Sequence, residues 1–575
     1  MKFKMSKIAA AVVAVGAIGS AQAVTVNQDG LGEVLLVPYY NVNNNFQTNI
    51  HIVNTKNESK IVKVRFRESG NSQDVLDFNI YMSPYDVWTG VVRNVNGKAN
   101  LISTDNTCTL PLNDSATSVG TLNSTGWNMN TVYPDVEDSD AREGYVEIIE
   151  VGVIKANQYA DTDGNGTIDN TKDMEIVAGI KHGSDGKPAD CSVITSAWTN
   201  GVGTNGNAAS RNNWGTSTVS GATATYVGDS DANAALSEPT GGLYGHAIYL
   251  NNATGAAYVA QDTALSNYAN KSQHYRPDDP AWFLLPSLAS GDVRTSGVVN
   301  AGGDAIVNPG SNWPLAVDAT LNDGDKNTPA SGNNPFPMAH AMQAVSVLND
   351  YFIDPTYDGA TDWVVTFPMR KHGIFNGQYT EDCDDDGTEE SSTQQVTFNA
   401  DNVPTAAVTE SDPSDVCFEK KDQDVAIQVQ PFDREEQQPA PGGFGVSPVL
   451  GSPDTILERE VNILNFQSTA SSVLGSDNAK TINTGTSFVT GWMKLTFNNK
   501  YEFVESQLSD ATVDFADADG GADGGTGLVA ADHTFEGVPV IGFAALRGKN
   551  PVGSSFGETV DHRFERDVTV NSDDF

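Results

Sequence analysis

The chain is poor in cysteine, in basic residues and in long apolar runs, and each shortage excludes a class of protein. Its 575 residues include 4 cysteines, 33 Lys and Arg against 74 Asp and Glu, and 8 histidines. A formal net charge of −41 repels nucleic acid and anionic lipid, so we expect neither as a partner. No stretch approaches the roughly 20 apolar residues of a membrane-spanning helix, so we expect no transmembrane segment in the mature chain.

Sequence motifs of catalysis and of common cofactors are also missing. No histidine lies in H-E-x-x-H, and no cysteine pair has C-x-x-C or C-x-x-C-H spacing, which excludes zinc-protease and c-type haem signatures. Ser555 lies in a G-x-S-x-G match, but a polar turn precedes it where a nucleophile elbow needs a strand. We interpret that match as coincidence, and we predict no enzymatic activity, no haem and no nucleotide cofactor.

The first 23 residues are typical of a cleaved signal peptide. Lys2, Lys4 and Lys7 precede an apolar run, residues 8–18, which Ala21-Gln22-Ala23 follows as a small-residue cleavage site. The apolar run is too short to span a bilayer. We therefore expect residues 1–23 to be removed after Ala23 and the mature chain to reach the outer surface or the medium of a Gram-negative-type bacterium, rather than the periplasm.

Four cysteines in an exported chain favour two disulfides over free thiols. Three connectivities are possible. We favour the pairing of neighbours in the sequence, Cys108 with Cys191 and Cys383 with Cys417. Each bond would close a long loop and so restrict the unfolded chain.

The region between Glu33 and Val92 predicts a mainly β fold. Short runs rich in Val, Ile, Phe and Tyr recur about every 10 to 15 residues, and Asn, Ser and Gly separate them. This spacing is typical of an antiparallel β-sandwich rather than of β-α-β units. The runs are EVLLVPYY, TNIHIVN, KIVKVRFRE, VLDFNIYM and DVWTGVV.

The run KIVKVRFRE alternates between apolar and charged residues. Val62, Val64 and Phe66 lie on one face of the expected strand, and the other face carries cations, Lys63, Arg65 and Arg67. We expect the cationic face to be exposed to solvent.

The rest of the chain predicts more strands, few helices and long polar loops. Further strands are expected at residues 144–151, 243–250, 256–260, 362–367, 425–429, 461–466, 492–497 and 538–546. Short helices are expected at residues 190–198, 263–268 and 337–351. A chain of this length exceeds one core, so we expect an N-terminal β-sandwich region with long loop insertions at residues 24–290 and a C-terminal β-rich region at 291–575.

The segment DTDGNGTID, residues 161–169, resembles a calcium-binding loop. Asp161, Asp163 and Asn165 place oxygen ligands at alternate positions, Thr167 offers a carbonyl, and Asp169 lies at the ninth position. The expected glutamate at the twelfth position is replaced by lysine, so a solvated acidic turn is the alternative. We predict a calcium site here.

A second segment, DCDDDGTEE, has the same register in a weaker form. Its candidate calcium ligands are Asp382, Asp384, Asp386 and Glu390. A disulfide at Cys383 would stiffen the loop, and an acidic turn is an equal interpretation.

Tryptophans in polar loops offer a possible surface for sugars, because an exposed indole stacks on a sugar ring. Trp127, Trp214 and Trp313 lie in such loops, although a loop tryptophan often anchors its own loop. Trp88, Trp363 and Trp492 lie in apolar, strand-like contexts and are expected in the core.

The N-terminal sequence, together with four later segments, resembles a family of secreted Gram-negative bacterial proteins known only as cell surface proteins. The likeness is carried by VPYYNVNNNFQTNIHIVN and the residues that follow it to Gly90, and then, in order, by GYVEIIEVG, TDWVVTFP, FDREE and DHRFER. It implies export and surface residence, and it assigns no activity and no site residue.

These observations predict a secreted or surface-exposed structural or adhesive β protein, stabilised by disulfides and by calcium. A carbohydrate-binding or polysaccharide-cleaving protein is one alternative, and a subunit of an extracellular filament or surface layer is another. The expected partners are surface polysaccharide, other envelope proteins or further copies of the chain.

Overall fold

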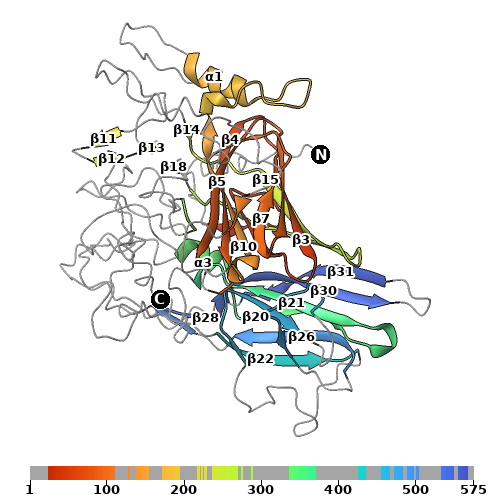
Figure 1. Ribbon diagram of the computed structural model, residues 1–575. Coiled ribbons are helices and arrows are strands. Elements are labelled where there is room, and N and C mark those ends of the chain that lie inside the picture. Colours follow the sequence, from red (N-terminus) through yellow and green to blue (C-terminus); the bar gives the residue numbers. More distant parts are fainter. Residues whose placement is uncertain are drawn as a thin grey trace, which may run out of the picture.

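The fold is described from a computed structural model. The described residues are 24–70, 72–110, 127–129, 138–154, 171–194, 217–219, 222–224, 226–228, 236–269, 273–275, 286–288, 336–370, 425–434, 455–466, 472–482, 488–497, 500–503, 533–549 and 555–566. Strands dominate these residues, which confirms the mainly β fold, and nearly every pairing is antiparallel (Figure 1).

Two sheets form a first sandwich. In the described residues, sheet 1 has eight strands in the order β1-β17-β2-β10-β4-β5-β8, with β14 beside β10, and sheet 2 has the order β16-β15-β3-β6-β7-β9. The bounds in sheet 1 are Thr25–Val26 (β1), Thr263–Ser266 (β17), Val34–Asn41 (β2), Glu143–Ile154 (β10), Ser59–Glu68 (β4), Asp74–Met82 (β5), Cys108–Leu110 (β8) and Leu236–Ser237 (β14). Those in sheet 2 are Ala257–Gln261 (β16), Leu243–Asn251 (β15), Phe46–Asn54 (β3), Val87–Val95 (β6), Lys98–Ile102 (β7) and Trp127–Asn128 (β9).

Two further sheets form a second sandwich. Sheet 3 has the order β23-β22-β26-β20-β32, and sheet 4 has the order β25-β24-β21-β30-β31. The bounds in sheet 3 are Thr455–Leu457 (β23), Val425–Phe432 (β22), Thr490–Phe497 (β26), Ser346–Phe352 (β20) and Arg563–Glu565 (β32). Those in sheet 4 are Lys480–Thr481 (β25), Val461–Asn465 (β24), Ala360–Thr366 (β21), Ile541–Lys549 (β30) and Ser555–Asp561 (β31).

Short elements complete the described structure. The helices are α1 (Thr171–Ile180) and α3 (Phe336–Met342), with 3-10 turns at Asp140–Arg142 (η1) and Pro355–Tyr357 (η4). Paired short strands are β11 (Ser217–Val219) with β12 (Ala222–Ala224), β13 (Tyr226–Gly228) with β18 (Gln273–Tyr275), β19 (Gln343–Ala344) with β29 (Val538–Pro539), and β27 (Lys500–Phe503) with β28 (His533–Glu536).

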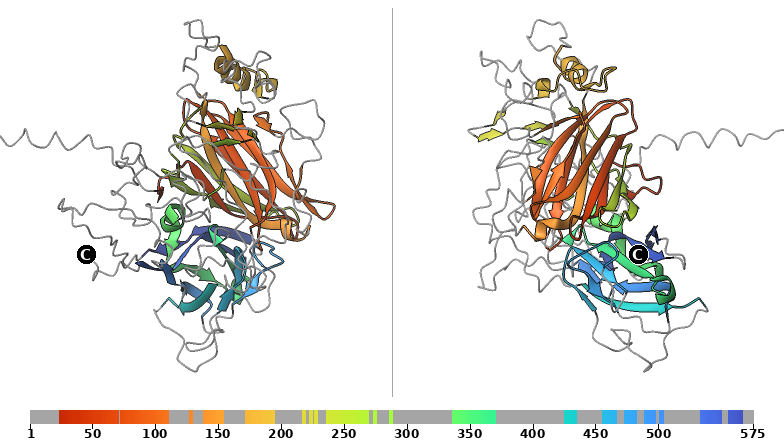
Figure 2. Two further views of the ribbon diagram at one scale, coloured as in Figure 1. Left: turned by 90° about the vertical axis from the view of Figure 1, so that its left-hand side faces the viewer. Right: turned by 45° about the vertical axis from the view of Figure 1, so that its right-hand side comes forward.

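The two sandwiches lie end to end and their cores are continuous (Figure 2). The central strands of sheet 4 are buried on both faces, because Val364 and Phe543 pack into the core of the first sandwich while Trp363 packs against sheet 3. Tyr249 of β15 stacks on Phe543 with ring centroids 5.5 Å apart. The sandwiches draw their strands from either side of the expected division at 290/291, whose position lies outside the described residues and stays a prediction.

Three helix predictions have different outcomes. The helix expected at residues 263–268 is wrong, because Thr263–Ser266 is strand β17. Neighbouring apolar side chains of this strand enter different cores. Residues 337–351 are right only in part, because the helix ends at Met342 and strand β20 begins at Ser346. The third expected helix, 190–198, extends beyond the described residues.

The expectation of a solvated cationic face on β4 is also wrong. Lys63, Arg65 and Arg67 are at most 1% exposed. A third layer covers this outer face of sheet 1: α1 packs at one end and α3 at the other, and between them His274 of β18 contacts Tyr81 of β5. In Figure 1, α1 lies at the end of the first sandwich that is farthest from the second.

The buried cations are paired across neighbouring strands. Arg65 lies directly opposite Asp77 of β5 and Glu147 of β10 in the ladder, and its guanidinium nitrogens reach their carboxylates at 3.1 and 3.5 Å. Arg67 binds Glu147 at 2.7 Å and Asp74 at 2.9 Å. We call these residues, together with Lys63, the outer ion network.

The network carries three cations and three carboxylates, so its charge is balanced. Lys63 reaches Asp77 at 3.1 Å. Burial nevertheless lowers the pKa of Lys63 to about 8, because desolvation outweighs the attraction of that carboxylate. Neutralisation across strands is therefore what allows charged side chains to lie beneath a third layer.

A separate buried carboxylate, Glu33, carries a pH dependence. It accepts hydrogen bonds from the backbone N–H groups of Tyr268 at 2.7 Å and Ala269 at 3.1 Å. Burial, with a further contribution from nearby Glu150, raises the pKa of Glu33 from 4.5 to about 7. The folded protein therefore holds this proton more tightly than the unfolded chain does.

Glu33→Gln should remove part of the pH dependence of stability. The contribution of a raised carboxyl pKa is fully present below about pH 4.5 and is lost as the pH rises through 7, a change of about 3 kcal/mol. The parent should lose about 3 kcal/mol of unfolding free energy from this group between pH 4.5 and 8, and Glu33→Gln should not lose it. Denaturant titrations at several pH values measure it. Exposed Glu558→Gln is the control, and an equal effect of both variants would contradict the assignment.

Candidate functional site

The candidate site lies at the end of the first sandwich, where the β5–β6 turn meets the loop that follows α1. A depression of about 410 Å³ opens there. We call it the distal pocket, and its lining residues are Ser83, Pro84, Tyr85, Asp86, Val87, Asp105, Asn106, Lys181, His182 and Gly186.

The first wall of the distal pocket is a tight turn. Asp86 N–H donates to Ser83 O at 3.2 Å across the turn. Pro84 at the second position and a positive φ of 60° at Tyr85 define a type II turn, whose third position favours glycine. The Asp86 carboxylate accepts from the backbone N–H of Ser83 at 2.9 Å and of Val87 at 2.8 Å. This turn holds Tyr85 outward, and its side chain is 65% exposed.

The second wall comes from the loop after α1, and a disulfide attaches it to the sandwich. Cys191 is bonded to Cys108 of β8, with Cα atoms 5.5 Å apart and a sequence separation of 83. Gly179, in the last turn of α1, permits close packing of this loop, since a Cβ there would lie 2.6 Å from Val193. The expected Cys108–Cys191 pair is therefore present in the structure, whereas Cys383 and Cys417 lie outside the described residues.

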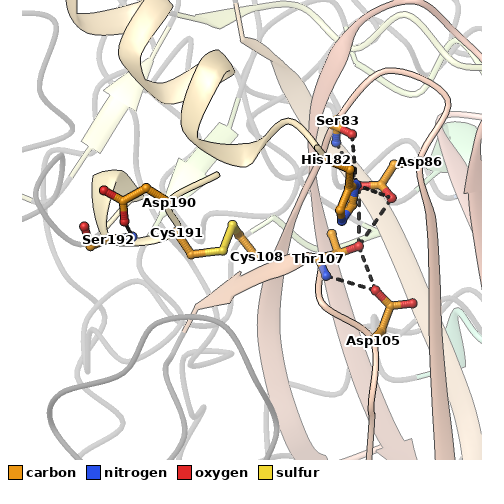
Figure 3. The surroundings of a disulfide bond; sticks show 9 residues. All are labelled: Ser83, Asp86, Asp105, Thr107, Cys108, His182, Asp190, Cys191 and Ser192. Atoms are coloured by element: carbon orange, nitrogen blue, oxygen red, sulfur yellow. Dashed lines mark hydrogen bonds and ion pairs between the residues drawn. A yellow bond between two sulfur atoms is a disulfide. The ribbon is translucent and has the colours of Figure 1, made fainter. Parts of the chain in front are cut away.

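A polar cluster joins the two walls (Figure 3). His182 Nδ1 lies 3.4 Å from Asp86 Oδ1 and 3.3 Å from Ser83 Oγ. Thr107 N–H and Oγ1 donate to Asp105 at 2.9 and 2.8 Å. Burial raises the pKa of Asp86, and its hydrogen bonds and the attraction of His182 partly offset that rise.

Ser83, His182 and Asp86 have the composition of a catalytic triad but a different geometry. A triad needs the carboxylate on one imidazole nitrogen and the serine on the other. Here both partners are near Nδ1 of His182. The Asp86 carboxylate is also occupied by two backbone N–H groups. This arrangement positions His182 at the pocket and provides no relay of a proton from Ser83 Oγ through the ring.

Both predicted calcium loops lie outside the described residues. They are Asp161, Asp163, Asn165, Thr167 and Asp169, and Asp382, Asp384, Asp386 and Glu390. Within the described ranges, no group of three or more His, Cys, Asp or Glu side chains is placed to hold a metal ion. Calcium binding therefore stays a prediction from the sequence.

Calcium at the first loop should raise the stability of the mature chain. For sites that bind in the roughly 0.1 to 1 mM range, 10 mM Ca²⁺ adds about 1 to 3 kcal/mol to the unfolding free energy. We expect thermal unfolding in EGTA and in excess Ca²⁺ to show a higher midpoint with calcium. Asp163→Ala should abolish the increase, with Asp384→Ala testing the second loop. An unchanged midpoint in the parent would remove this prediction.

The tryptophan predictions have mixed outcomes. Trp88 and Trp363 are buried in the two cores, as expected. Trp127 packs against the core with its ring 5.1 Å from Phe78, so it anchors its own segment. Trp492 is only partly buried and stacks on Phe432 at 4.1 Å. Trp214 and Trp313 lie outside the described residues.

The sequence reasoning missed Tyr85 as a site residue. Its one local signal is the Ser-Pro-Tyr-Asp turn, which has tyrosine where a type II turn favours glycine. No sequence pattern marks Lys181 and His182 as site residues, because only the folded chain brings the loop after α1 to the β5–β6 turn.

Comparison of the chain with protein-family models, curated proteins and solved structures finds no match. In the part of the chain that the structure describes, no helix combines the length and the apolar character needed to cross a membrane. The distal pocket must therefore be interpreted from its own chemistry.

Proposed function

We propose that this chain is an exported protein displayed at the outer cell surface, where its sandwiches serve as a structural and adhesive body. The observation that carries the proposal is the Cys108–Cys191 disulfide. Disulfides of this kind persist in oxidising compartments and are rare in a reducing cytosol. The signal-peptide pattern of residues 1–23 and the resemblance to cell surface proteins agree with export.

The position of the distal pocket supports the adhesive part of the proposal. The second sandwich lies at one end of the molecule, and α1 with the loop after it lies at the other (Figure 1). The outer ion network and the continuous core stabilise the body between them. A protein attached at or near the second sandwich would present the pocket outward.

Export can be tested through the state of the cysteines. We expect the full chain expressed in its host to carry the Cys108–Cys191 bond, as judged by alkylation and mass spectrometry. Removal of residues 1–23 should retain the chain in the cytoplasm with Cys108 and Cys191 reduced. A native chain found reduced in the cytosolic fraction would contradict the proposal.

A carbohydrate-binding function is the second candidate. It is favoured by the distal pocket, which has a polar lining and one prominently exposed aromatic side chain, Tyr85. Trp127, which the sequence suggested as a stacking surface for a sugar ring, is packed against the core.

A further inference from the structure

We propose that the distal pocket binds a carboxylate-bearing saccharide, with a sugar ring on the face of Tyr85, its carboxylate on Lys181 and its hydroxyl groups on Asn106 and His182. This inference rests on the proposed adhesive function and names the ligand class of that site. It follows from the exposure of Tyr85, from the chemistry of the pocket lining and from the volume of the depression.

Tyr85 holds an unfavourable backbone conformation and remains exposed. A bulky residue at φ 60° is a conformational outlier, and such strain is concentrated at functional sites. Its N–H donates to Lys56 O at 3.1 Å, and the turn around it is fixed by the Asp86 carboxylate. The surrounding hydrogen bonds therefore maintain the strain, and its effect is to present an aromatic ring at 65% exposure.

The two carboxylates of the pocket already accept hydrogen bonds from the protein. Asp86 accepts from the N–H groups of Ser83 and Val87. Asp105 accepts from Thr107 through one oxygen and from Thr89 N–H, at 3.1 Å, through the other. A ligand that donates hydrogen bonds to these carboxylates would compete with the bonds from the protein.

The donors of the pocket remain available. The ammonium group of Lys181 is exposed and makes no ion pair or hydrogen bond in the part of the chain that the structure describes. Asn106 is half-buried, and His182 contacts Ser83 and Asp86 through Nδ1, so Nε2 of a neutral imidazole can accept from a ligand hydroxyl. The exposed ammonium group of Lys181 can pair with one carboxylate, and this contact acts at short range against the repulsion of an anion by a chain of net charge −41.

A uronic-acid residue combines the features that the pocket recognises. Its ring has an apolar C–H face that packs against an aromatic side chain, its hydroxyl oxygens accept hydrogen bonds, and its carboxylate pairs with a lysine ammonium. The volume of about 410 Å³ falls within the roughly 300 to 1,000 Å³ of small-molecule sites. A neutral sugar would use Tyr85 but not the charge of Lys181.

The test is binding of a hexagalacturonate oligomer to the mature protein, measured by titration calorimetry with maltohexaose as the neutral comparison. We expect hexagalacturonate to bind at least tenfold more tightly than maltohexaose. Tyr85→Gly and Lys181→Met should each weaken hexagalacturonate binding about tenfold or more. Tyr357→Ala, at an aromatic residue that is 40% exposed on the second sandwich, should leave binding unchanged.

Tyr85→Gly separates loss of the ligand contact from loss of the fold. Glycine adopts a positive φ without strain, so its unfolding midpoint should equal or exceed that of the parent while binding is lost. Equal binding of the two oligomers, no binding by the parent, or full binding by Tyr85→Gly would each overturn the inference. Surface display is measured separately on cells, so it can stand when this inference fails.

Discussion

Replacing Arg65 by methionine should lower the unfolding free energy by about 3 to 5 kcal/mol. The substitution keeps a long apolar side chain but removes the cation between Asp77 and Glu147, whose carboxylates lie 3.1 and 3.5 Å from it. The outer ion network would then hold two cations against three carboxylates beneath the third layer. The excess of one buried negative charge is what makes the loss large.

The double variant Arg65→Met, Glu147→Met distinguishes charge balance from packing. It leaves Lys63 with Asp77 at 3.1 Å and Arg67 with Asp74 at 2.9 Å, so each remaining cation keeps a partner. We expect the double variant to be more stable than Arg65→Met alone. If packing alone mattered, the second substitution would add to the damage.

An exposed ion pair provides the control for the network. Lys549 and Asp358 lie 2.7 Å apart with both side chains about half exposed, and such pairs contribute little because water and salt screen them. Lys549→Met should change the unfolding free energy by less than about 0.5 kcal/mol. Denaturant titration monitored by tryptophan fluorescence measures all of these variants. A loss from Lys549→Met that equals the loss from Arg65→Met would contradict the account of the network.

Removing the disulfide is the second large effect that we expect. The bond joins residues 83 positions apart, and the chain-entropy relation assigns a loop of that length about 4 to 5 kcal/mol. Cys108→Ala with Cys191→Ala should lose stability of this order. The loop after α1 should also lose its attachment, so amide hydrogen exchange at residues 176–194 should accelerate and binding at the distal pocket should weaken.

The other two cysteines provide the matched control. Cys383→Ala with Cys417→Ala leaves the Cys108–Cys191 bond in place, so exchange at residues 176–194 should stay slow. Reduction of the parent should reproduce the behaviour of the Cys108 and Cys191 variant. Slow exchange in the variant that lacks Cys108 and Cys191 would contradict this prediction. It would show that the packing of Ile176 and Ile180 in the cluster with Ile61 and Tyr81 holds the loop without the bond.

Local sequence predicted the strands well because each strand has its own pattern of β-branched and aromatic residues. The expected strand at 144–151 is found as β10, Glu143–Ile154, and the expected strand at 243–250 as β15, Leu243–Asn251. The pairing of Cys108 with Cys191 was also predicted. These features depend on neighbours in the sequence or on a choice among few alternatives.

The burial of charge could not be predicted from the alternation in β4. Lys63 and Arg65 alternate with Val62 and Val64 as they would in a strand with one face in water. The third layer on this face is formed by segments far away in sequence, and what neutralises the cations is the register that places Asp77 and Glu147 opposite Arg65. Neither the layer nor the register is contained in a nine-residue pattern.

The candidate site was missed for a similar reason. The turn that presents Tyr85 and the loop that carries Lys181 and His182 are almost 100 residues apart, and the disulfide brings that loop against the sandwich. The one local sign was tyrosine after Pro84, at a turn position that favours glycine.

Surface display is the central claim, and labelling of intact cells tests it most directly. Cells producing the native chain would be treated with a membrane-impermeant amine-reactive biotin, and modification of Lys181 and Lys187, both exposed in the loop after α1, would be measured by mass spectrometry. The account predicts that both lysines are labelled on intact cells, with the Cys108–Cys191 bond present in the same molecules. Labelling that occurs only after the cells are broken would contradict it.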